Sequence, residues 1–191
     1  MDKDQAGAAD RARLSAEVER LRALVASLEE RVAKLDGLAH QDSLIAIPNR
    51  RGFMRELDRL IASVQRYKGS AAMLFVDLDG LKMINDSFGH RAGDEALIEV
   101  AGLLAKGIRR SDVVARIGGD EFGILLERAD RASAQETALR LTNLIGDCEF
   151  SHDGDALPLS VAIGIAMIED GDSAEEVMAR ADAEMYRRKA A

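Results

Sequence analysis

The N-terminal part of the chain carries an apolar side chain at two positions of a seven-residue repeat. One position holds Leu14, Leu21, Leu28 and Leu35, and the other holds Val18, Val25, Val32 and Ala39. β-Branched residues at a with leucine at d favour a parallel pair of helices. We therefore predict that residues 1–40 form an N-terminal helix that dimerises as a parallel coiled coil. The alternative is one amphipathic helix packed on its own domain, which usually shows a wider apolar stripe.

The hydrophobic pattern changes after residue 40, where helical spacing and continuous apolar runs alternate. Helical spacing covers residues 53–64, 97–108, 134–145 and 177–185, whereas strand-like patterns cover residues 71–79, 112–127 and the C-terminal half of 149–168. Helices that alternate with strands indicate a layered α/β domain. We predict an α/β (α+β) sandwich over residues 41–191, with a central mixed sheet flanked by helices.

Composition narrows the possible partners. Of 191 residues, 47% are hydrophobic, and the formal net charge is −8. Nucleic-acid-binding domains are usually basic, so we expect no bulk binding to DNA or RNA. No apolar run approaches the ~20 residues that span a bilayer, and the N-terminus has no apolar leader segment. We expect a cytoplasmic protein without membrane contact. Cys148 is the single cysteine, and we expect it to be a small core residue.

The run Gly118-Gly119-Asp120-Glu121-Phe122 lies between the apolar stretches VVARI and GILLE. This pattern predicts a β-hairpin whose turn is acidic and opened by glycine. Such a turn can hold a divalent cation and a triphosphate if a second carboxylate comes from elsewhere. Asp77 ends the apolar run 71–79 and is the best candidate, because a buried carboxylate needs a cation or hydrogen-bond donors. Asp79 is better explained as the start of a turn at Gly80.

Polar residues that suit guanine follow the Asp77 strand. Asn85 and Asp94 flank a glycine-containing loop, and Lys82 is five residues beyond Asp77. Amide and carboxylate oxygens can accept hydrogen bonds from the amine and ring N–H of a purine. The alternative is local, with Asn85 and Asp86 in a turn and Asp94 capping the next helix.

Four ordered motifs resemble those of the GGDEF diguanylate cyclase family. GGDEF itself is unaltered at residues 118–122, and FVDLDGLKMINDSFGHRAGDEAL is similar to the strand and nucleotide loop of the family. DSLIAIPNRRGF at residues 42–53 resembles the motif that leads into the domain, and ADAEMYRRK resembles the closing motif. The resemblance covers about residues 40–189. One departure is Ile45-Ala46-Ile47 where Thr-Gly-Leu is common, which we expect to alter the path from the coiled coil to the domain.

The resemblance implies a palm-like nucleotidyl cyclase fold that condenses two GTP molecules into cyclic di-GMP and two pyrophosphates in a homodimer, a second-messenger reaction of bacteria. It further implies that Asp77 and Asp120 bind Mg²⁺, with Mn²⁺ as a possible substitute, assisted by the backbone of Leu78. Asp120, Glu121 and Lys82 are the implied catalytic residues. The implied GTP-binding residues are Asn85 and Asp94 for guanine, and Gly118, Gly119 and Lys189 for phosphate.

Arg109 and Asp112 form an RxxD motif, and five residues separate Asp112 from Gly118. A surface ion pair is the ordinary explanation of such a motif. Its position relative to GGDEF resembles that of the inhibitory site at which the family binds its product. Arg140 is a candidate for a second arginine at this site. Three other functions stay open: a catalytically silent receptor for GTP or cyclic di-GMP, a scaffold that acts through its coiled coil, and a cyclase that closes a single nucleotide.

Overall fold

The computed structural model describes residues 3–190, and the side chains from residue 13 onward except those of Ser15, Leu38 and residues 33–35. The predicted seam residue Leu35 lies outside these described side chains. The chain divides into two compact units, one ending at Ala39 and the other beginning at His40.

Helix α1 (Lys3–His40) is continuous, as the heptad pattern predicts. Six residues of its apolar seam are between 42% and 65% exposed: Leu14, Val18, Leu21, Val25, Leu28 and Val32. Charged side chains flank the seam and pair within the helix, with Arg20 Nη2 2.7 Å from Glu17 Oε1 and Arg22 Nη1 3.0 Å from Glu19 Oε1. An apolar stripe along a single helix is therefore open to solvent in this chain.

The second unit is built on a sheet whose strands, among the described residues, have the order β2-β3-β1-β6. These strands are β1 (Ala71–Leu78), β2 (Val113–Arg116), β3 (Glu121–Glu127) and β6 (Val161–Met167). The α/β sandwich and the hairpin at residues 112–127 are confirmed. A second hairpin joins β4 (Ser151–His152) to β5 (Asp155–Ala156).

The prediction of a mixed sheet was wrong, because all three pairings in the main sheet are antiparallel. Helices between strands suggested parallel neighbours. The strands that helices connect do run parallel, but another strand lies between them: β3 separates β1 from β2, and β1 separates β3 from β6. The C-terminal end of β1 consequently lies beside the start of β3.

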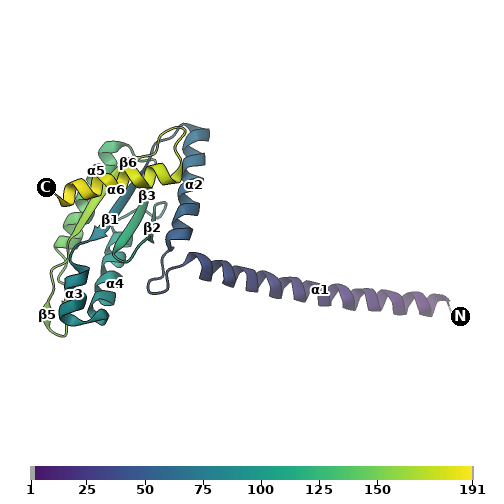
Figure 1. Ribbon diagram of the computed structural model, residues 1–191. Coiled ribbons are helices and arrows are strands. Elements are labelled where there is room, and N and C mark those ends of the chain that lie inside the picture. Colours follow the sequence, from purple (N-terminus) through teal and green to yellow (C-terminus); the bar gives the residue numbers. More distant parts are fainter. Residues whose placement is uncertain (1–2, 191) are drawn as a thin grey trace. The chain divides into compact units, whose positions relative to one another are not determined.

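Helices cover both faces of the sheet (Figure 1). Buried residues of α3 (Leu81–Phe88), α4 (His90–Lys106) and α5 (Arg131–Gly146) pack on one face, and those of α2 (Arg50–Tyr67) and α6 (Ala174–Lys189) on the other. Alternate residues of β1 supply the two cores, with Leu74 and Val76 facing α4 and α5, and Met73 and Phe75 facing α2 and α6. Asp77 continues the second series, so it lies on the α2/α6 face.

The ends of the helices agree with their local sequence. Asn49 caps α2 by accepting from Gly52 N at 3.0 Å, one residue after Pro48. Asp130 caps α5 through Ser133 N, and Ser173 and Glu176 form a capping box at the start of α6. Such caps satisfy backbone N–H groups that would otherwise lack partners. The capping box fixes where α6 starts, and therefore where its last residue, Lys189, lies.

Gly164 lets α6 lie directly on β6. A Cβ at this position would overlap the carbonyl oxygen of Ala181 and the amide nitrogen of Met185. Because both are backbone atoms of α6, they cannot move aside as a flexible side chain can. The glycine therefore sets the distance between the helix and the sheet.

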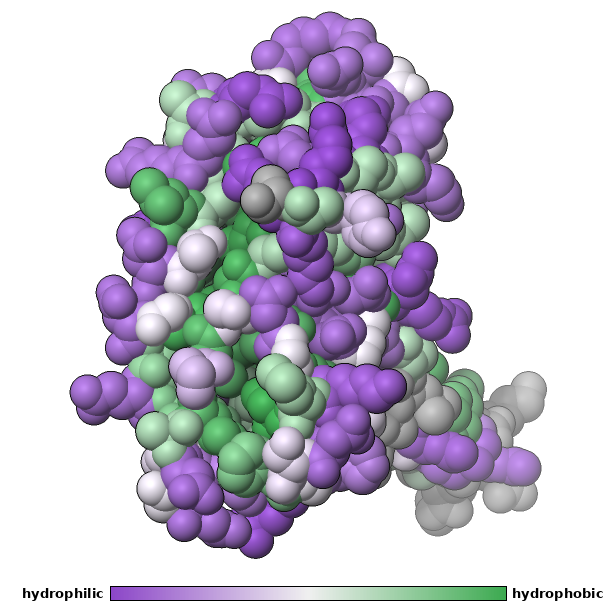
Figure 2. Space-filling model, turned by 60° about the vertical axis from the view of Figure 1, so that its left-hand side comes forward, coloured by the Kyte–Doolittle hydropathy of each residue, from purple (hydrophilic) through white to green (hydrophobic). Residues whose placement is uncertain are grey.

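On the face shown in Figure 2, hydrophilic side chains predominate and apolar side chains gather in a strip between them. Among the described residues, none of the helices combines the length and the apolar character needed to cross a bilayer.

Candidate active site

The turn at residues 118–122 (the signature turn) is held against the end of β1. Ile117 N and Gly118 N both donate to Glu121 O, at 2.9 and 3.2 Å, which closes the hairpin. Leu78 N donates to Asp120 O at 2.9 Å. A Cβ on Gly118 would overlap the Glu121 carboxylate, whereas a Cβ on Gly119 would meet nothing within 4 Å. A side chain at Gly118 would thus displace the Glu121 carboxylate, and Gly119 leaves the outer side of the turn open.

Three carboxylates meet where β1 and β3 pair. Asp77 and Glu121 are direct partners in the register, and Asp120 precedes Glu121 in the turn. Desolvation, followed by the charges of Asp120 and Asp77, raises the pKa of Glu121. Desolvation also raises the pKa of Asp77. Lys189 lowers this pKa and the charges of Asp120 and Asp79 raise it, and the net shift is upward. The site thus concentrates negative charge in a partly dehydrated place.

Lys189 brings a cation to this cluster from the last residue of α6. Its ammonium donates a hydrogen bond to Asp77 Oδ1 and lies 3.5 Å from Asp79 Oδ1. The Lys189 side chain is 34% exposed and that of Asp77 is 13% exposed. Burial lowers the pKa of Lys189, but hydrogen bonding and the charges of Asp77 and Asp79 outweigh it, so that the pKa lies above its ordinary value. The predicted phosphate ligand therefore does lie beside the predicted metal ligand.

Asp79 has a local role, as the sequence suggested. Ser160 Oγ donates to Asp79 Oδ2 at 2.8 Å, and Asp79 N donates to Ser160 O at 2.9 Å. Gly80 follows with φ of 71°, a left-handed conformation that glycine adopts without strain. Asp79 thus anchors the turn that leads from β1 into α3.

The donor set fits a magnesium ion. Asp77 and Asp120 offer hard carboxylate oxygens, and Leu78 belongs to the same strand end. Within the described part of the chain, no three His, Cys, Asp or Glu side chains are arranged as a complete metal cage. Mg²⁺ is commonly held by one or two carboxylates while substrate phosphates and water fill its other positions. The chain offers that kind of partial site.

The predicted guanine ligands lie on two packed helices, and the local alternative for them was wrong. Asn85 is inside α3 and Asp94 is in the second turn of α4, so neither lies in a loop and Asp94 is not a helix cap. A Cβ on Gly93 would overlap Asn85 Oδ1, which places the amide directly against the residue before Asp94. Lys82, in the first turn of α3, is exposed.

The RxxD motif and Arg140 come together in one surface pocket of about 120 Å³. Asp112 caps the local turn, accepting from Arg109 N at 3.0 Å and from Glu127 N at 3.3 Å. Arg140 Nη1 donates to the carbonyl oxygen of Gly107. The two arginines thus line a common pocket, and the Asp112 carboxylate already accepts backbone hydrogen bonds.

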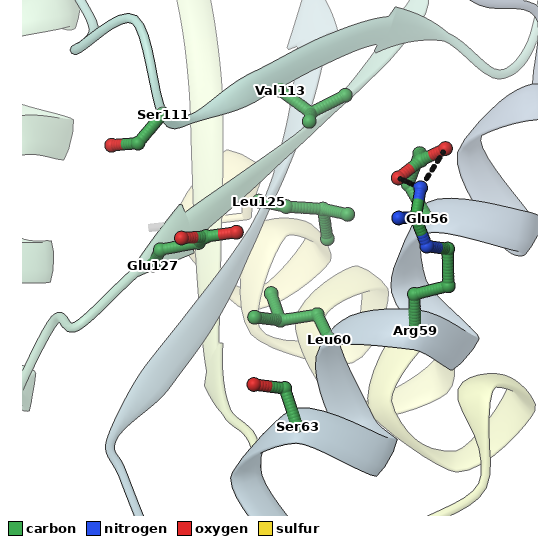
Figure 3. Close-up of a pocket in the computed structure, with 8 residues that line it drawn as sticks. All are labelled: Glu56, Arg59, Leu60, Ser63, Ser111, Val113, Leu125 and Glu127. Carbon is green, nitrogen blue, oxygen red and sulfur yellow. Dashed lines mark hydrogen bonds and ion pairs between the residues drawn. The ribbon is translucent and has the colours of Figure 1, made fainter.

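A larger pocket of about 390 Å³ lies next to this one and shares Glu127 with it. Figure 3 shows its apolar floor of Leu60, Val113 and Leu125, with the Glu56–Arg59 ion pair at its edge. Ser111, which lies between the two residues of the RxxD motif, also lines this pocket.

The sequence reasoning missed Arg116 and Asp42, whose side chains contact each other, and of which Arg116 also contacts the signature turn. It also missed a partly buried link between the β4–β5 hairpin and α4, where His152 Nδ1 lies 2.7 Å from Glu95 Oε2. Asp42 belongs to a motif noted in the sequence, but hydrophobic periodicity cannot signal an arginine two residues before the turn.

Known proteins have sequences similar to that of this chain. The family described as "Diguanylate cyclase, GGDEF domain" matches residues 39–191. A protein of Escherichia coli named probable diguanylate cyclase DgcE is 40% identical over 152 residues, which are 79% of this chain and 14% of that protein. Diguanylate cyclase TpbB of Pseudomonas aeruginosa is 38% identical over 165 residues, 84% of this chain and 38% of that protein. The chain therefore spans well under half the length of these relatives.

A solved structure has a similar fold over nearly the whole chain. It contains the coiled coil and GGDEF domain of DgcB from Caulobacter crescentus in complex with c-di-GMP. The TM-score is 0.85 at 27% sequence identity, and the match covers 93% of this chain and 94% of that one. Together with the carboxylates at the ends of β1 and of the signature turn, these matches show that the chain belongs to the GGDEF diguanylate cyclase family.

Proposed function

We propose that this chain is a diguanylate cyclase, which condenses two GTP molecules into cyclic di-GMP and two pyrophosphates. The observation that carries the proposal is the convergence of Asp77, Asp120 and Glu121 at the end of β1, under an intact Gly118-Gly119 turn. Family membership supports it.

In this proposal the chain's residues divide the work of binding. Asn85 and Asp94 accept hydrogen bonds from guanine, and Lys82 and Lys189 contact phosphates. The open side of Gly119 leaves room for the triphosphate against the turn. Asp77 and Asp120, with the backbone of Leu78, would hold Mg²⁺, which would neutralise charge on the triphosphate and on the pyrophosphate leaving group. Glu121 positions the reacting groups.

The reaction requires two copies of the chain. The 3′-hydroxyl oxygen of one GTP bonds to the α-phosphorus of the other, the bond to the β-phosphate bridging oxygen breaks, and pyrophosphate leaves with the electron pair while the hydroxyl loses its proton. A second, reciprocal transfer closes the ring. One protomer binds one GTP, so two sites must face each other, a proximity effect. The exposed seam of α1 supports a homodimer as the means.

The decisive experiment is a product assay. Protein, GTP and Mg²⁺ are incubated and the nucleotides are separated by chromatography. We expect cyclic di-GMP and pyrophosphate, and a loss of at least ~100-fold in rate for Asp120→Asn, which removes a metal-ligand charge while keeping the shape of the side chain. Cyclic GMP as the product would instead indicate single-nucleotide cyclisation. Absence of any product from a dimeric sample would indicate a receptor, and a biological effect unchanged by Asp120→Asn would indicate a scaffold.

Feedback inhibition is the finer part of the proposal. Arg109, Asp112 and Arg140 share a pocket, and an arginine fork can meet O6 and N7 of guanine. We expect Arg109→Ala to weaken inhibition by added cyclic di-GMP about tenfold or more, with the uninhibited rate unchanged. The measurement is the rate of pyrophosphate release against cyclic di-GMP concentration. Inhibition of undiminished strength would exclude this pocket as the inhibitory site.

A further inference from the structure

The segment that leads into the domain, residues 41–49 (the junction segment), is folded into a closed turn. Asp42 N donates to Ile47 O at 2.9 Å, and Gln41 and Pro48 form an antiparallel bridge. Asp42 Oδ1 accepts from Leu44 N and from Ile45 N, each at 2.9 Å. One carboxylate oxygen thus organises the turn that stands in place of the family's Thr-Gly-Leu sequence.

Arg116 joins the junction segment to the signature turn. Its backbone N donates to Pro48 O at 2.9 Å, and its Nη1 lies 3.4 Å from Asp42 Oδ1. Its Nε and Nη2 donate to the carbonyl oxygen of Gly119, at 3.2 and 2.7 Å. The side chains of Arg116 and Asp42 are 16% and 15% exposed. Ion pairs shielded in this way are less screened than surface pairs.

The contact falls on the part of the signature turn that has least other support. Gly119 is exposed and has no side chain, and nothing lies within 4 Å of the place where its Cβ would be. The carbonyl of Gly119 belongs to the peptide group that joins Gly119 to Asp120. The carbonyl of Asp120 is itself fixed by a hydrogen bond from Leu78 N. The guanidinium therefore fixes the orientation of the peptide directly before the predicted metal ligand.

We propose that Arg116 is a positioning residue for catalysis: held by Asp42, it orients the Gly119–Asp120 peptide so that the Asp120 carboxylate meets magnesium-bound triphosphate. The inference rests on the proposed function. The guanidinium is suited to the task because its fork donates to two acceptors at once, in fixed directions. A lysine keeps the charge but offers a single nitrogen, so it can satisfy Asp42 or Gly119 but not hold both in register.

The test compares Arg116→Lys with the wild type by calorimetric titration of a non-hydrolysable GTP analogue, with Mg²⁺ and with EDTA. Because Asn85 and Asp94 lie elsewhere, on α3 and α4, we expect binding without metal to be unchanged. We expect the gain in affinity on adding Mg²⁺ to fall about tenfold, which corresponds to about 1.4 kcal/mol. The melting temperature should change by less than about 2 °C.

Arg59→Lys is the matched control, because Arg59 also pairs with a carboxylate, Glu56, but on the exposed side of α2. It should leave both affinities as in the wild type. Should Arg116→Lys fail to fold, Asp42→Asn is the second variant, since an amide oxygen can still accept from Leu44 N and Ile45 N while the charge that fixes Arg116 is gone. We expect it to lower the Mg²⁺-dependent gain about threefold.

Equal losses with and without Mg²⁺ would mean that the pair only supports the fold, and no loss would mean that the turn is oriented without it; either result overturns the inference. The titration does not depend on turnover. A wild-type protein that binds the analogue with Mg²⁺ but makes no cyclic di-GMP would therefore refute the proposed function and leave the role of Arg116 to be judged by the same comparison.

Discussion

At the scale of single residues, the position of Lys189 is informative because it places a cation where the proposed reaction needs one. Its ammonium contacts Asp77 and lies near Asp79, beside a cluster in which desolvation has raised the pKa of both Asp77 and Glu121. A carboxylate cluster of this kind is costly without a nearby positive charge. In the proposed complex with Mg²⁺ and GTP, we expect the same ammonium to contact the phosphates.

Lys189→Met tests this role, since methionine retains an unbranched apolar stem without the charge. We expect KM for GTP to rise about tenfold, because a hydrogen bond to a charged group is worth about 1.5–3 kcal/mol. We expect kcat to fall less than about threefold. Steady-state kinetics at saturating Mg²⁺ measure both constants. Lys68→Met is the control, because Lys68 makes an exposed ion pair with Asp170. A drop in kcat at unchanged KM would contradict a phosphate-binding role.

At the scale of elements, α6 connects the stability of the fold to the site. Its face of Val177, Ala181 and Met185 is buried, as the helical spacing predicts. Its start is fixed by the capping box, and by Arg180, whose Nη1 lies 2.7 Å and Nη2 2.6 Å from the two oxygens of Asp172. The sequence predicts the helix but not its depth on the sheet, because that depends on contact between backbones at Gly164.

Gly164→Ala should push α6 away from β6. An added methyl group in a close-packed interface typically costs about 1–3 kcal/mol, and we expect a loss of that size in the free energy of unfolding. We also expect KM for GTP to rise, because α6 carries Lys189. Urea denaturation and kinetics measure the two effects. Gly102→Ala in α4 is the control, since its Cβ meets nothing within 4 Å and alanine favours a helix. Equal stability of both variants would refute the close contact.

Asp172 makes the anchoring of α6 dependent on pH. The hydrogen bond from Arg180 lowers the pKa of this carboxyl below its ordinary value of 3.8. A carboxyl whose pKa is lower in the folded protein than in the unfolded chain stabilises the fold at any pH above its unfolded-state pKa. This stabilisation is lost as the pH falls through the folded-state pKa. We expect Asp172→Asn to lower the free energy of unfolding by about 2 kcal/mol at pH 7. In urea titrations the two proteins should converge below pH 3.8, and a difference that stays constant with pH would contradict the ion pair.

Elements with a long periodic pattern were predictable, whereas short ones and pairings were not. Helix α3 was missed because its eight residues bury only Leu81 and Ile84, too few for a period to emerge. The antiparallel order was missed because local patterns do not say which strand is inserted between two others. At the site, the motifs indicated Asp77, Asp120 and Lys189, but the contact of Arg116 with Gly119 depends on a hydrogen bond to the backbone that no residue pattern encodes.

At the scale of the whole molecule, the proposed reaction links the two units of the chain. A domain with one GTP site cannot complete the product alone, and the helix α1 carries an apolar seam exposed by 42% to 65%. Burying a leucine or valine side chain contributes about 1.5–3 kcal/mol. Pairing two helices through six such residues each would bury much of this exposed apolar surface, so we expect a dimer. In such a dimer, the coiled coil would raise the effective concentration of one site at the other.

Replacing Leu21 and Leu28 together by glutamine should weaken this dimer, because the change removes two leucine side chains from the d positions of the seam. We expect the rate of cyclic di-GMP formation per protomer to fall at least about tenfold at nanomolar protein and to recover at tens of micromolar, where mass action restores the dimer. Sedimentation over the same range should show the monomer where the rate is low. Leu24→Gln is the control, since Leu24 is 48% exposed on α1 but lies outside both series of the repeat. If the double variant is as active as the wild type at nanomolar protein, the seam does not bring the two sites together, and another surface of the domain must do so.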